Sequence, residues 1–429
     1  MIDYQLMLNI INTTVGIIFF VMLIVGWYYV AGLIASGKKV KPVPHSDKKT
    51  KFAVIIPARN EARVIKNSLS SMKKQTYDKD YFDVWVIVES EEDPTTIICR
   101  SFGYHYFVRK KLENRQTKGF AIQELTDYFE ENNIIYDSYL IFDADNIASP
   151  KYIEVMNDLR QSGVQVGMGY RNYTNASENT LTCISAVFFS YMFTFTARMR
   201  TNLFKKSTVC GTGFFIDRQL ILDAGGWIFT GMTEDTQLTT WCYYHDVNMR
   251  YYPLVEFYDE QGGTWQASHR QMIRWIWGYF ASRKEFRQKG GANYHTISKK
   301  RMFWAKFEYN VGIYPFVFYT ISNLLLFIVS FVLSLCSLID KSELTGNFVG
   351  QAFISLAILY ATFFAIAFAV IIKDNKKLKF NFPTATWTCF NYWLFFLFIL
   401  VGFLHGLFKP SLRRTWKPVD HSGKITIDV

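Results

Sequence analysis

The hydrophobic residues of this chain fall into two kinds of run. Long stretches with almost no charge lie at roughly 10–35, 311–339, 349–372 and 383–408. Each is close to or longer than the ~20 apolar residues that a helix needs to cross a hydrocarbon core of ~30 Å. Between the first and the second stretch, the apolar runs are short and alternate with polar loops. The chain therefore predicts membrane helices on both sides of a globular domain.

Three of the short apolar runs predict strands of one sheet. They lie at 52–57, 84–88 and 138–142, and each leads into a polar or acidic loop and then a helical segment. Buried strands that alternate with helices are typical of a parallel, doubly wound sheet. Ligands bind such sheets at the carboxyl ends of the strands, which is where the acidic clusters of this chain fall.

The charges beside the long stretches predict which side of the membrane the domain occupies. Residues 1–9 carry only Asp3, whereas three lysines lie within 38–41, after a first stretch that is too long for a signal peptide. Because lysine and arginine favour the cytosolic side, the globular domain is expected in the cytosol. A lysine-rich loop expected at 373–379 would also lie inside, and residues 340–343 outside.

One segment conflicts with this orientation. Residues 409–417 are basic and look cytosolic, but four crossings would put them outside. Either one C-terminal stretch is re-entrant or the tail breaks the charge rule, and the sequence leaves both open.

Composition and charge narrow the class of protein. Hydrophobic residues make up 50% and aromatic residues 18% of the 429 positions, which is more than a soluble core needs. The net charge of +11 gathers beside the long apolar stretches and forms no stripe with stacking aromatic residues, which disfavours a nucleic-acid enzyme. The six cysteines lie far apart with no C-x-x-C pair, so neither a zinc ribbon nor a disulfide framework is indicated.

Two carboxylates follow the predicted strand at 138–142. Asp143 and Asp145 are one residue apart on a turn, where they could hold a hard divalent cation against a diphosphate. Such pairs also occur by chance on solvated turns, but the position at a strand end favours a ligand site. Mg²⁺ and Mn²⁺ both suit these ligands.

A second acidic pair, Glu234 and Asp235, precedes a predicted helix at 236–244. The simplest interpretation is a capped helix start, where threonine and acidic residues are common. The functional interpretation makes Asp235 a general base that takes a proton from an acceptor hydroxyl. Sugar transfer with inversion needs one such base and a stabilised leaving diphosphate.

Residues 270–282 predict a helix whose apolar side suits the membrane interface. Gln271, Arg274 and Trp275 lie three and four positions apart and therefore share one face of this helix. Arg274 and Trp275 could be interfacial anchors. Alternatively, Arg274 could stabilise the charge that develops on a departing diphosphate. An amphipathic stretch at 183–204 predicts a further interfacial helix.

Six short segments occur in one order within residues 50–280. They are Val-Ile-Ile-Pro-Ala-Arg-Asn-Glu (54–61), Lys-Gly-Phe-Ala (118–121), Asp-Ala-Asp (143–145), Cys-Gly-Thr-Gly (210–213), Thr-Glu-Asp (233–235) and Gln-x-x-Arg-Trp (271–275). Together they resemble the family 2 membrane glycosyltransferases, which include cellulose, hyaluronan and poly-N-acetylglucosamine synthases. No segment is specific alone, but six with comparable spacing are hard to obtain by accident.

The resemblance implies a GT-A-like, doubly wound α/β domain inserted between transmembrane helices, with amphipathic interfacial helices. The implied parts are a first membrane helix (1–36), a cytosolic catalytic domain (50–262), interfacial helices (263–305), C-terminal membrane helices (306–408) and a basic tail (409–429).

The resemblance also implies roles for single residues. Lys118 would meet the diphosphate, and Asp143 and Asp145 would hold the divalent cation. Asp235, beside Glu234, would be the catalytic base.

Other residues would surround the donor and the acceptor. By resemblance, Gln271, Arg274 and Trp275 would close over the diphosphate and the acceptor end. The nucleotide sugar would also meet Ala58, Asn60, Glu61, Glu89 and Glu91, and the acceptor pocket would be lined by Cys210, Gly211, Thr212 and Gly213.

Two departures from the family bear on specificity. Relatives usually carry an aspartate after the second strand that contacts the uracil, whereas this chain has Glu89 and Glu91 there. Residues 259–264 lack a proline that is common in relatives, so this loop is expected to be more mobile.

These expectations describe a metal-dependent, inverting β-glycosyltransferase of the plasma membrane that uses a UDP-sugar to extend a surface polysaccharide, with coupled export. Transfer of one sugar to a membrane lipid would use the same residues and stays open. A non-catalytic synthase partner also stays open, although Asp145, Asp235 and Arg274 are all present. A transporter is disfavoured because the long apolar stretches hold almost no ionisable residue beyond His405. Neither the donor sugar nor the oligomeric state is indicated.

Overall fold

The computed structural model describes residues 34–110, 113, 115–288 and 345–409, with single positions among 6–17 and 303–335. The predicted membrane stretches at 10–35 and 311–339 lie almost entirely outside the described residues. So do the outside loop at 340–343, the end of the interfacial region at 289–302 and the tail from 410 onward.

The described residues form one eight-stranded sheet with the strand order β3-β2-β1-β4-β7-β6-β8-β5. The strands are β1 (Phe52–Pro57), β2 (Phe82–Val88), β3 (His105–Val108), β4 (Ser138–Ile141), β5 (Ile147–Ala148), β6 (Val166–Tyr173), β7 (Phe214–Asp217) and β8 (Met249–Asp259).

Three predicted strands are confirmed as β1, β2 and β4, and β1 pairs in parallel with both of the others. The prediction of a parallel sheet is wrong for the other half, because β7 runs antiparallel to both β4 and β6. The sheet is therefore mixed. The chain between β6 and β7 passes through α6 and α7 and returns in the opposite direction, so it makes no parallel crossover.

Helices cover both faces of the sheet. Alternate residues of β1 belong to two different cores: Ala53 and Ile55 pack with α4 (Lys118–Glu131), whereas Phe52, Val54 and Ile56 face the other side. The other side is covered by α2 (Ile65–Lys73), α3 (Thr95–Phe102) and α5 (Tyr152–Gln161). A strand that is buried on both faces has a continuous run of apolar residues in the sequence, and β1 was predictable for this reason.

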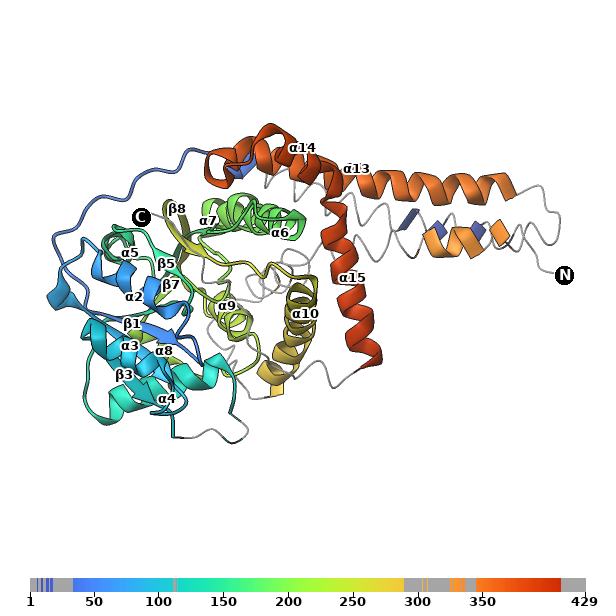
Figure 1. Ribbon diagram of the computed structural model, residues 1–429. Coiled ribbons are helices and arrows are strands. Elements are labelled where there is room, and N and C mark those ends of the chain that lie inside the picture. Colours follow the sequence, from blue (N-terminus) through green and yellow to red (C-terminus); the bar gives the residue numbers. More distant parts are fainter. Residues whose placement is uncertain are drawn as a thin grey trace.

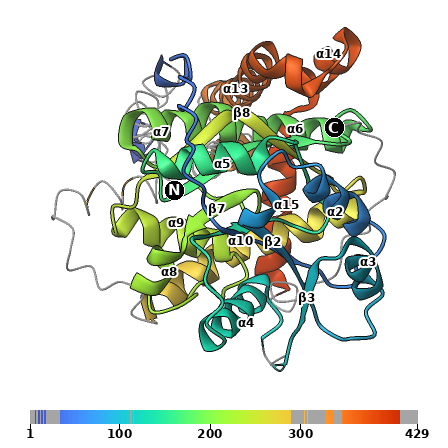
Figure 2. The ribbon, with the colours of Figure 1, turned by 90° about the vertical axis from the view of Figure 1, so that its left-hand side faces the viewer.

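The stretch predicted as an interfacial helix at 183–204 forms α6 (Thr180–Ser190), a π-helical segment (Tyr191–Ala197) and α7 (Arg198–Phe204). The Asn179 side chain accepts hydrogen bonds from the N–H groups of Leu181 and Thr182, which caps α6. Although this stretch is long and apolar enough to span a membrane, 67% of its most apolar window is buried inside the protein. Figures 1 and 2 both show α6 and α7 between the sheet and α13.

The C-terminal helices differ from the predicted pattern in two ways. α13 (Thr345–Leu378) includes the predicted span at 349–372 but continues through Lys373 and Lys377, so the predicted loop at 373–379 is mostly helical. The predicted span at 383–408 is divided into α14 (Phe382–Asn391) and α15 (Trp393–Phe408), which are bent by 42°. Within the described residues, two helices could cross a membrane, or three if the bent pair is one span.

One hydrophobic core joins the catalytic half to these C-terminal helices. Phe129 and Tyr139 of the sheet region belong to the same cluster as Phe363 of α13 and Phe396 of α15. The rings of Phe363 and Phe396 stack with their centroids 3.7 Å apart. Figure 1 shows α15 beside α10 (Trp265–Gln288). The axis of α15 points in a different direction from the axis of α13.

Candidate active site

Lys118 brings three predicted segments together. It is the first residue of α4, and its Nζ contacts Oδ1 of Asp143 at the end of β4. The same ammonium group donates to the Gly211 carbonyl at 2.7 Å and lies 4.0 Å from Oε1 of Glu234. Glu234 and Asp235 begin α9 (Glu234–Tyr244), so the lysine, the D-x-D turn, the glycine-rich segment and the second acidic pair meet at one place.

The start of α4 is held against the segment that leads to the acidic pair. A Cβ at Gly119 would lie 2.1 Å from the Phe229 carbonyl oxygen, so only glycine permits this close approach. Thr117 caps the helix and donates its hydroxyl to the Thr230 carbonyl at 2.8 Å. These two contacts fix the distance between Lys118 and α9.

α10 packs against the same acidic pair. A Cβ at Gly278 would lie 2.7 Å from Cγ2 of Thr233, directly before Glu234. The Trp275 ring meets Phe189 of α6 edge to face at 5.5 Å. Gln271 and Arg274 are half-buried on this helix. The predicted helix at 270–282 is thus confirmed as part of a longer one, beside the second acidic pair.

Burial sets the protonation of this cluster. It raises the pKa of Glu234 to about 8, although the Lys118 charge opposes the shift. Burial also raises the pKa of Asp235, against a hydrogen bond from the Thr236 N–H and the charge of Lys118. Both carboxyl groups are therefore weaker acids here than in water.

The two cations of the cluster, Arg274 and Lys118, interact electrostatically with the same carboxylates. Burial lowers the pKa of Arg274, and the charges of Glu234, Asp143 and Asp235 oppose this shift. Burial also disfavours the charge on Lys118, but Asp143 and Glu234 outweigh it and raise the pKa of Lys118. Arg274 thus shares an electrostatic environment with Asp143, Glu234 and Asp235, as the sequence predicts.

A hydrogen-bond network holds the D-x-D turn. The Asp143 N–H donates to Oγ1 of Thr212 at 2.8 Å and to Oδ1 of Asn146 at 3.1 Å. The Asn146 amide donates to Oδ1 of Asp145 at 3.2 Å and to Oδ1 of Asp259 at 2.9 Å. The turn is therefore fixed by side chains from the loop that precedes β7 and from the end of β8.

Arg171 extends this network toward Trp275. Its Nε donates to Oδ2 of Asp259 at 2.9 Å, and a terminal nitrogen donates to the Cys210 carbonyl at 3.3 Å. Burial opposes the charge of Arg171, but Asp259 raises its pKa. The guanidinium lies 4.6 Å from the ring centroid of Phe189, which also contacts Trp275. The sequence analysis did not identify Arg171, Asn146 or Asp259 as site residues.

The residues present fit a divalent cation. Within the described residues, no group of three or more histidine, cysteine or acidic side chains could hold a metal ion alone. Asp143 and Asp145 offer carboxylates at a strand end, and the Asp143 side chain is 38% exposed. Mg²⁺ is commonly bound by one or two carboxylates together with substrate phosphates, so this pair suits a cation that arrives with a diphosphate.

The segment from Cys210 to Gly213 forms a wall beside Asp235. Gly211 and Gly213 have φ angles of +78° and +64°, a conformation that favours glycine. A Cβ at Gly211 would lie 3.7 Å from Oδ2 of Asp235, and one at Gly213 would overlap the Phe257 ring. Burial raises the pKa of Cys210 to about 12, so the Cys210 side chain is a neutral thiol.

The loop after β1 adopts a sharp turn that the sequence analysis did not explain. Asn60 has a φ of 58°, and its N–H donates to Oδ2 of Asp93 at 2.9 Å. Ala58 continues the pairing of β1 with β2 through the Ile87 carbonyl, and the Glu61 carbonyl accepts the N–H groups that start α2. Asp93 is a buried residue that the sequence analysis missed because it lies within a run of acidic loop residues.

The two candidate glutamates of this region are placed differently. Glu89 is 2.7 Å from Nε of Arg59 and 3.7 Å from NH1 of Arg109, within the loop cluster. Glu91 forms an exposed ion pair with Arg100 at 3.1 Å. Glu89 is therefore the better placed of the two to meet a ligand at the strand ends.

The loop at 259–264 is tied to its neighbours. The Gln261 N–H donates to Oδ1 of Asn175 at 3.0 Å, and Oγ of Ser268 donates to the Gly262 carbonyl at 3.0 Å. Asp259 is buried with Arg171. These hydrogen bonds link the loop to the segment before α6 and to the start of α10, and the expected mobility of the loop stays a prediction.

Residues 49–278 match the family described as "Glycosyltransferase like family 2". This segment is more than half of the chain, and the chain belongs to the family 2 glycosyltransferases.

Several similar proteins are also named as sugar transferases or glycolipid synthases. The chain is 27% identical over 381 residues to the "Probable glycosyltransferase YdaM" of Bacillus subtilis (strain 168), covering 85% of each protein. It is 25% identical over 234 residues to a "Beta-monoglucosyldiacylglycerol synthase" of Trichormus variabilis, covering 53% of this chain and 48% of that protein. A "Probable glucomannan 4-beta-mannosyltransferase 7" of Oryza sativa subsp. japonica is 25% identical over 233 residues, or 52% of this chain and 40% of that one. The chain thus matches less than half the length of the latter two.

A solved structure shares the fold. The "Mannosyltransferase PcManGT from Pyrobaculum calidifontis in complex with GDP-Man and Mn2+" aligns with 93% of this chain and 98% of its own, at a TM-score of 0.52 and 14% identity. The catalytic domain therefore has the GT-A-like α/β fold that the resemblance implied, with a mixed rather than a fully parallel sheet.

Proposed function

We propose that this glycosyltransferase is an inverting, UDP-sugar-dependent enzyme of the membrane that extends a surface polysaccharide at the cytosolic face. The observation that carries the proposal is the convergence of Lys118, Asp143 and the acidic pair of α9 in one partly buried cluster, whose carboxylates also interact electrostatically with Arg274.

Asp235 is the proposed catalytic base. Its carboxylate takes the proton of an acceptor hydroxyl, whose oxygen attacks the anomeric carbon of the donor sugar from the face opposite the diphosphate. The bond between that carbon and the diphosphate oxygen breaks, and the configuration inverts. Gly211 lies beside this carboxylate, since a Cβ there would be 3.7 Å from Oδ2 of Asp235.

Lys118 and Arg274 are the proposed partners of the leaving diphosphate. Both cations are half-buried beside carboxylates, where their attraction to a diphosphate is stronger than in bulk water. A divalent cation held by Asp143 and Asp145 would neutralise part of the diphosphate charge. The Mn²⁺ in the mannosyltransferase of the same fold supports this assignment.

The remaining residues would shape the donor and acceptor pockets. Ala58, Asn60, Glu61 and Glu89 lie at the ends of β1 and β2, where a nucleotide binds in a parallel sheet. Trp275, against Phe189 of α6, is the proposed platform for the acceptor end. Gln271 lies one turn away on the same helix.

Contacts around α13 support a cytosolic catalytic domain. Nζ of Lys373 donates to the Ser36 carbonyl at 3.2 Å, so the end of α13 lies level with the chain just after the first predicted span. Nζ of Lys377 donates to the Pro253 carbonyl of β8 at 2.9 Å. The lysines that end α13 therefore lie on the side of the sheet domain, as cytosolic lysines should.

The bend between α14 and α15 supports a re-entrant segment. α15 packs along α10, where Cβ atoms at Gly402 and Gly406 would contact Met272 and Trp277. We infer that α15 lies at the interface beside α10 and does not cross the membrane, which keeps the basic tail in the cytosol. This arrangement removes the conflict between the predicted crossings and the charge of residues 409–417.

The direct test is a donor screen on purified full-length protein. A panel of UDP-sugars is supplied with Mn²⁺ or Mg²⁺, and released UDP and product length are measured. We expect one UDP-sugar to be preferred, a lengthening product, and loss of UDP release when a chelator removes the cation. Full activity in excess chelator would exclude the proposed metal dependence.

Single transfer to a membrane lipid is the second candidate. The match to a monoglucosyldiacylglycerol synthase favours it. A product that carries one sugar and never lengthens, extractable into organic solvent, would select this candidate over the polymer.

A further inference from the structure

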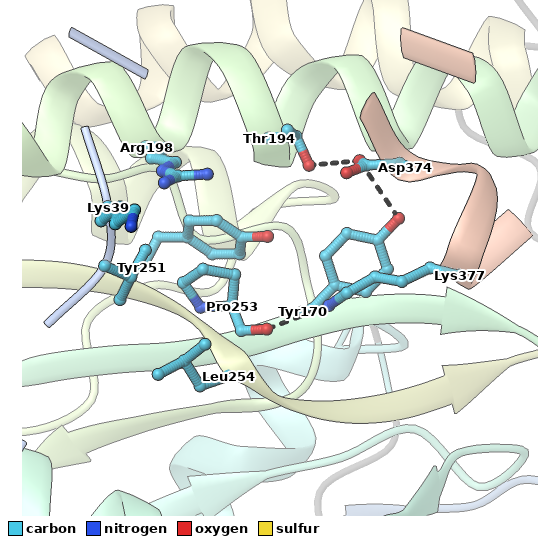
Figure 3. A pocket seen from close by; sticks show the side chains of 10 residues that line it. Lys39, Tyr170, Thr194, Arg198, Tyr251, Pro253, Leu254, Asp374 and Lys377 are labelled. Atoms are coloured by element: carbon cyan, nitrogen blue, oxygen red, sulfur yellow. Dashed lines mark hydrogen bonds between the residues drawn. The ribbon is translucent and has the colours of Figure 1, made fainter. Parts of the chain in front are cut away.

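A separate pocket lies on the membrane-proximal side of the sheet domain (Figure 3). Its volume is about 370 Å³, and none of the proposed donor or acceptor residues lines it. Lys39 and Val40 of the linker after the first predicted span form one edge, β8 forms the floor, and the end of α13 forms the far wall. The pocket thus lies where the cytosolic ends of two predicted membrane segments meet the catalytic domain.

The pocket is lined by more positive than negative charge. Lys39, Arg198 and Lys377 are its cations, and Asp374 is its carboxylate. Nε of Arg198 is buried and has no hydrogen-bond partner among the described residues, and Figure 3 shows the guanidinium above the ring of Tyr251. The Lys39 side chain is exposed, and the described residues give it no ion pair.

One oxygen of the Asp374 carboxylate is held by hydroxyl groups. Its Oδ2 accepts hydrogen bonds from the hydroxyls of Ser190 and Thr194 and, at 3.5 Å, of Tyr170. Lys377 lies over the ring of Tyr170 at 3.6 Å and is 3.8 Å from Glu256, which does not line the pocket. Arg198 donates to the Lys38 carbonyl, and neither Arg198 nor Lys39 forms an ion pair among the described residues, so both can interact with an anion.

The floor of the pocket combines this charge with an exposed apolar side chain. The pairing of β6 with β8 shifts register between Met168 and Tyr170, so that residues 252–255 bulge from the sheet. Leu254 in this bulge is 57% exposed and lines the pocket. An apolar side chain beside basic groups is typical of a surface that meets lipid.

We propose that this pocket binds the phosphate headgroup of an anionic membrane lipid, with Lys39, Arg198 and Lys377 as its cationic ligands. The inference rests on the proposed membrane placement but not on the proposed sugar transfer. Phosphate is the chemistry that clustered lysine and arginine recognise. The lipid is favoured over a soluble phosphate because the pocket lies at the ends of membrane segments and carries Leu254 at its rim.

Native mass spectrometry of the full-length protein, released from an uncharged detergent, tests the proposal without any sugar donor. The protein is titrated with phosphatidylglycerol and, separately, with phosphatidylcholine. We expect preferential retention of one phosphatidylglycerol, and about fivefold weaker retention in Lys377→Gln and in Lys39→Gln, the typical effect of one basic residue near an anionic surface. Lys39→Gln removes no described contact, so its result does not depend on folding.

Lys376→Gln is the matched control, because Lys376 is exposed on the same helix and does not line the pocket. Equal losses for Lys376→Gln and Lys377→Gln would show only a diffuse basic surface and overturn the proposal. Equal retention of the two lipids would overturn it as well. Displacement of the bound lipid by millimolar inorganic phosphate would assign the site to a soluble anion and reject the lipid. UDP-sugar turnover in the Lys39→Gln variant separates this site from the catalytic one, and we expect it to persist.

Discussion

Two polar clusters in this protein hold their carboxylates in different ways. Asp374, between α13 and α6, is surrounded by hydroxyl donors from Ser190, Thr194 and Tyr170. Glu234 and Asp235 lie near two cations, Lys118 and Arg274, which also interact with Asp143, and burial raises the pKa of both acidic residues. Neutral hydroxyl groups stabilise Asp374, whereas cations stabilise the acidic pair of α9.

This difference separates a structural polar group from a functional one. A buried carboxylate with a full set of donors stabilises packing and needs no ligand. Neighbouring carboxylates with shifted pKa values repel one another, and binding of a cation or a proton relieves this repulsion. Such clusters are concentrated at active sites. Substitutions in the Asp374 cluster should therefore change mainly the stability of the protein, whereas substitutions in the second cluster should change mainly its turnover.

The largest expected effect is that of Asp235→Asn. The amide cannot accept the proton, so we expect a loss of turnover of about 10³-fold with donor binding retained. UDP release under saturating donor measures the loss. Asp223→Asn, an exposed aspartate in α8 (Arg218–Asp223), is the control and should leave turnover unchanged. Wild-type turnover in Asp235→Asn would refute the assigned base.

Arg274→Lys should have the next largest effect. Lysine keeps the charge but loses the planar, multiple donors that match a diphosphate, and we expect kcat to fall about 10²-fold. Arg270→Lys on an exposed position of the same helix is the matched control. If both variants keep the wild-type kcat, Arg274 is only an interfacial anchor.

Asp374→Ala tests the structural cluster. Three buried hydroxyls lose their shared acceptor, so we expect the free energy of unfolding to fall by about 3 kcal/mol. Thermal unfolding in detergent measures the change, and Asp374→Asn, which keeps an acceptor oxygen, should lose less. The kcat of the folded fraction should stay near that of the wild type, and a catalytic loss as large as that of Asp235→Asn would end the distinction between the clusters.

Glu234 is expected to control part of the pH dependence of stability. The pKa of Glu234 rises from 4.5 to about 8 on folding, so the folded state gains stability from the proton at low pH and loses it as pH rises through this range. In Glu234→Gln this loss is absent. Without metal or donor, the fall in Tm between pH 5 and pH 8 should therefore be smaller in the variant than in the wild type. Parallel Tm curves for the two proteins would contradict the raised pKa.

Local patterns made much of the fold and of the candidate site predictable. β1, β2 and β4 were predicted because buried parallel strands form continuous apolar runs. Asp143, Glu234 and Arg274 were predicted because each belongs to a short motif next to an element boundary. Their convergence in the structure agrees with the prediction, while the roles of the single residues remain for the experiments above.

Long-range contacts were not predictable. Arg171 and Asp259 are 88 positions apart in sequence, and no local pattern pairs them. β7 has only four residues, which is too few to show a period or a direction. The bend between α14 and α15 falls within an uninterrupted apolar stretch, so hydropathy indicated one span where the structure has two helices.

The shared core of the sheet domain and the C-terminal helices has a consequence for biogenesis. Ribosomes release residues 50–280 well before α13 and α15, yet Phe363 and Phe396 complete the cluster that contains Phe129 and Tyr139. Until α13 and α15 are synthesised, the nascent catalytic domain therefore exposes an apolar face, and such a state is prone to aggregation. Packing of α13 and α15 against this face is needed to complete the core, and an excised fragment of residues 50–280 would leave the face uncovered.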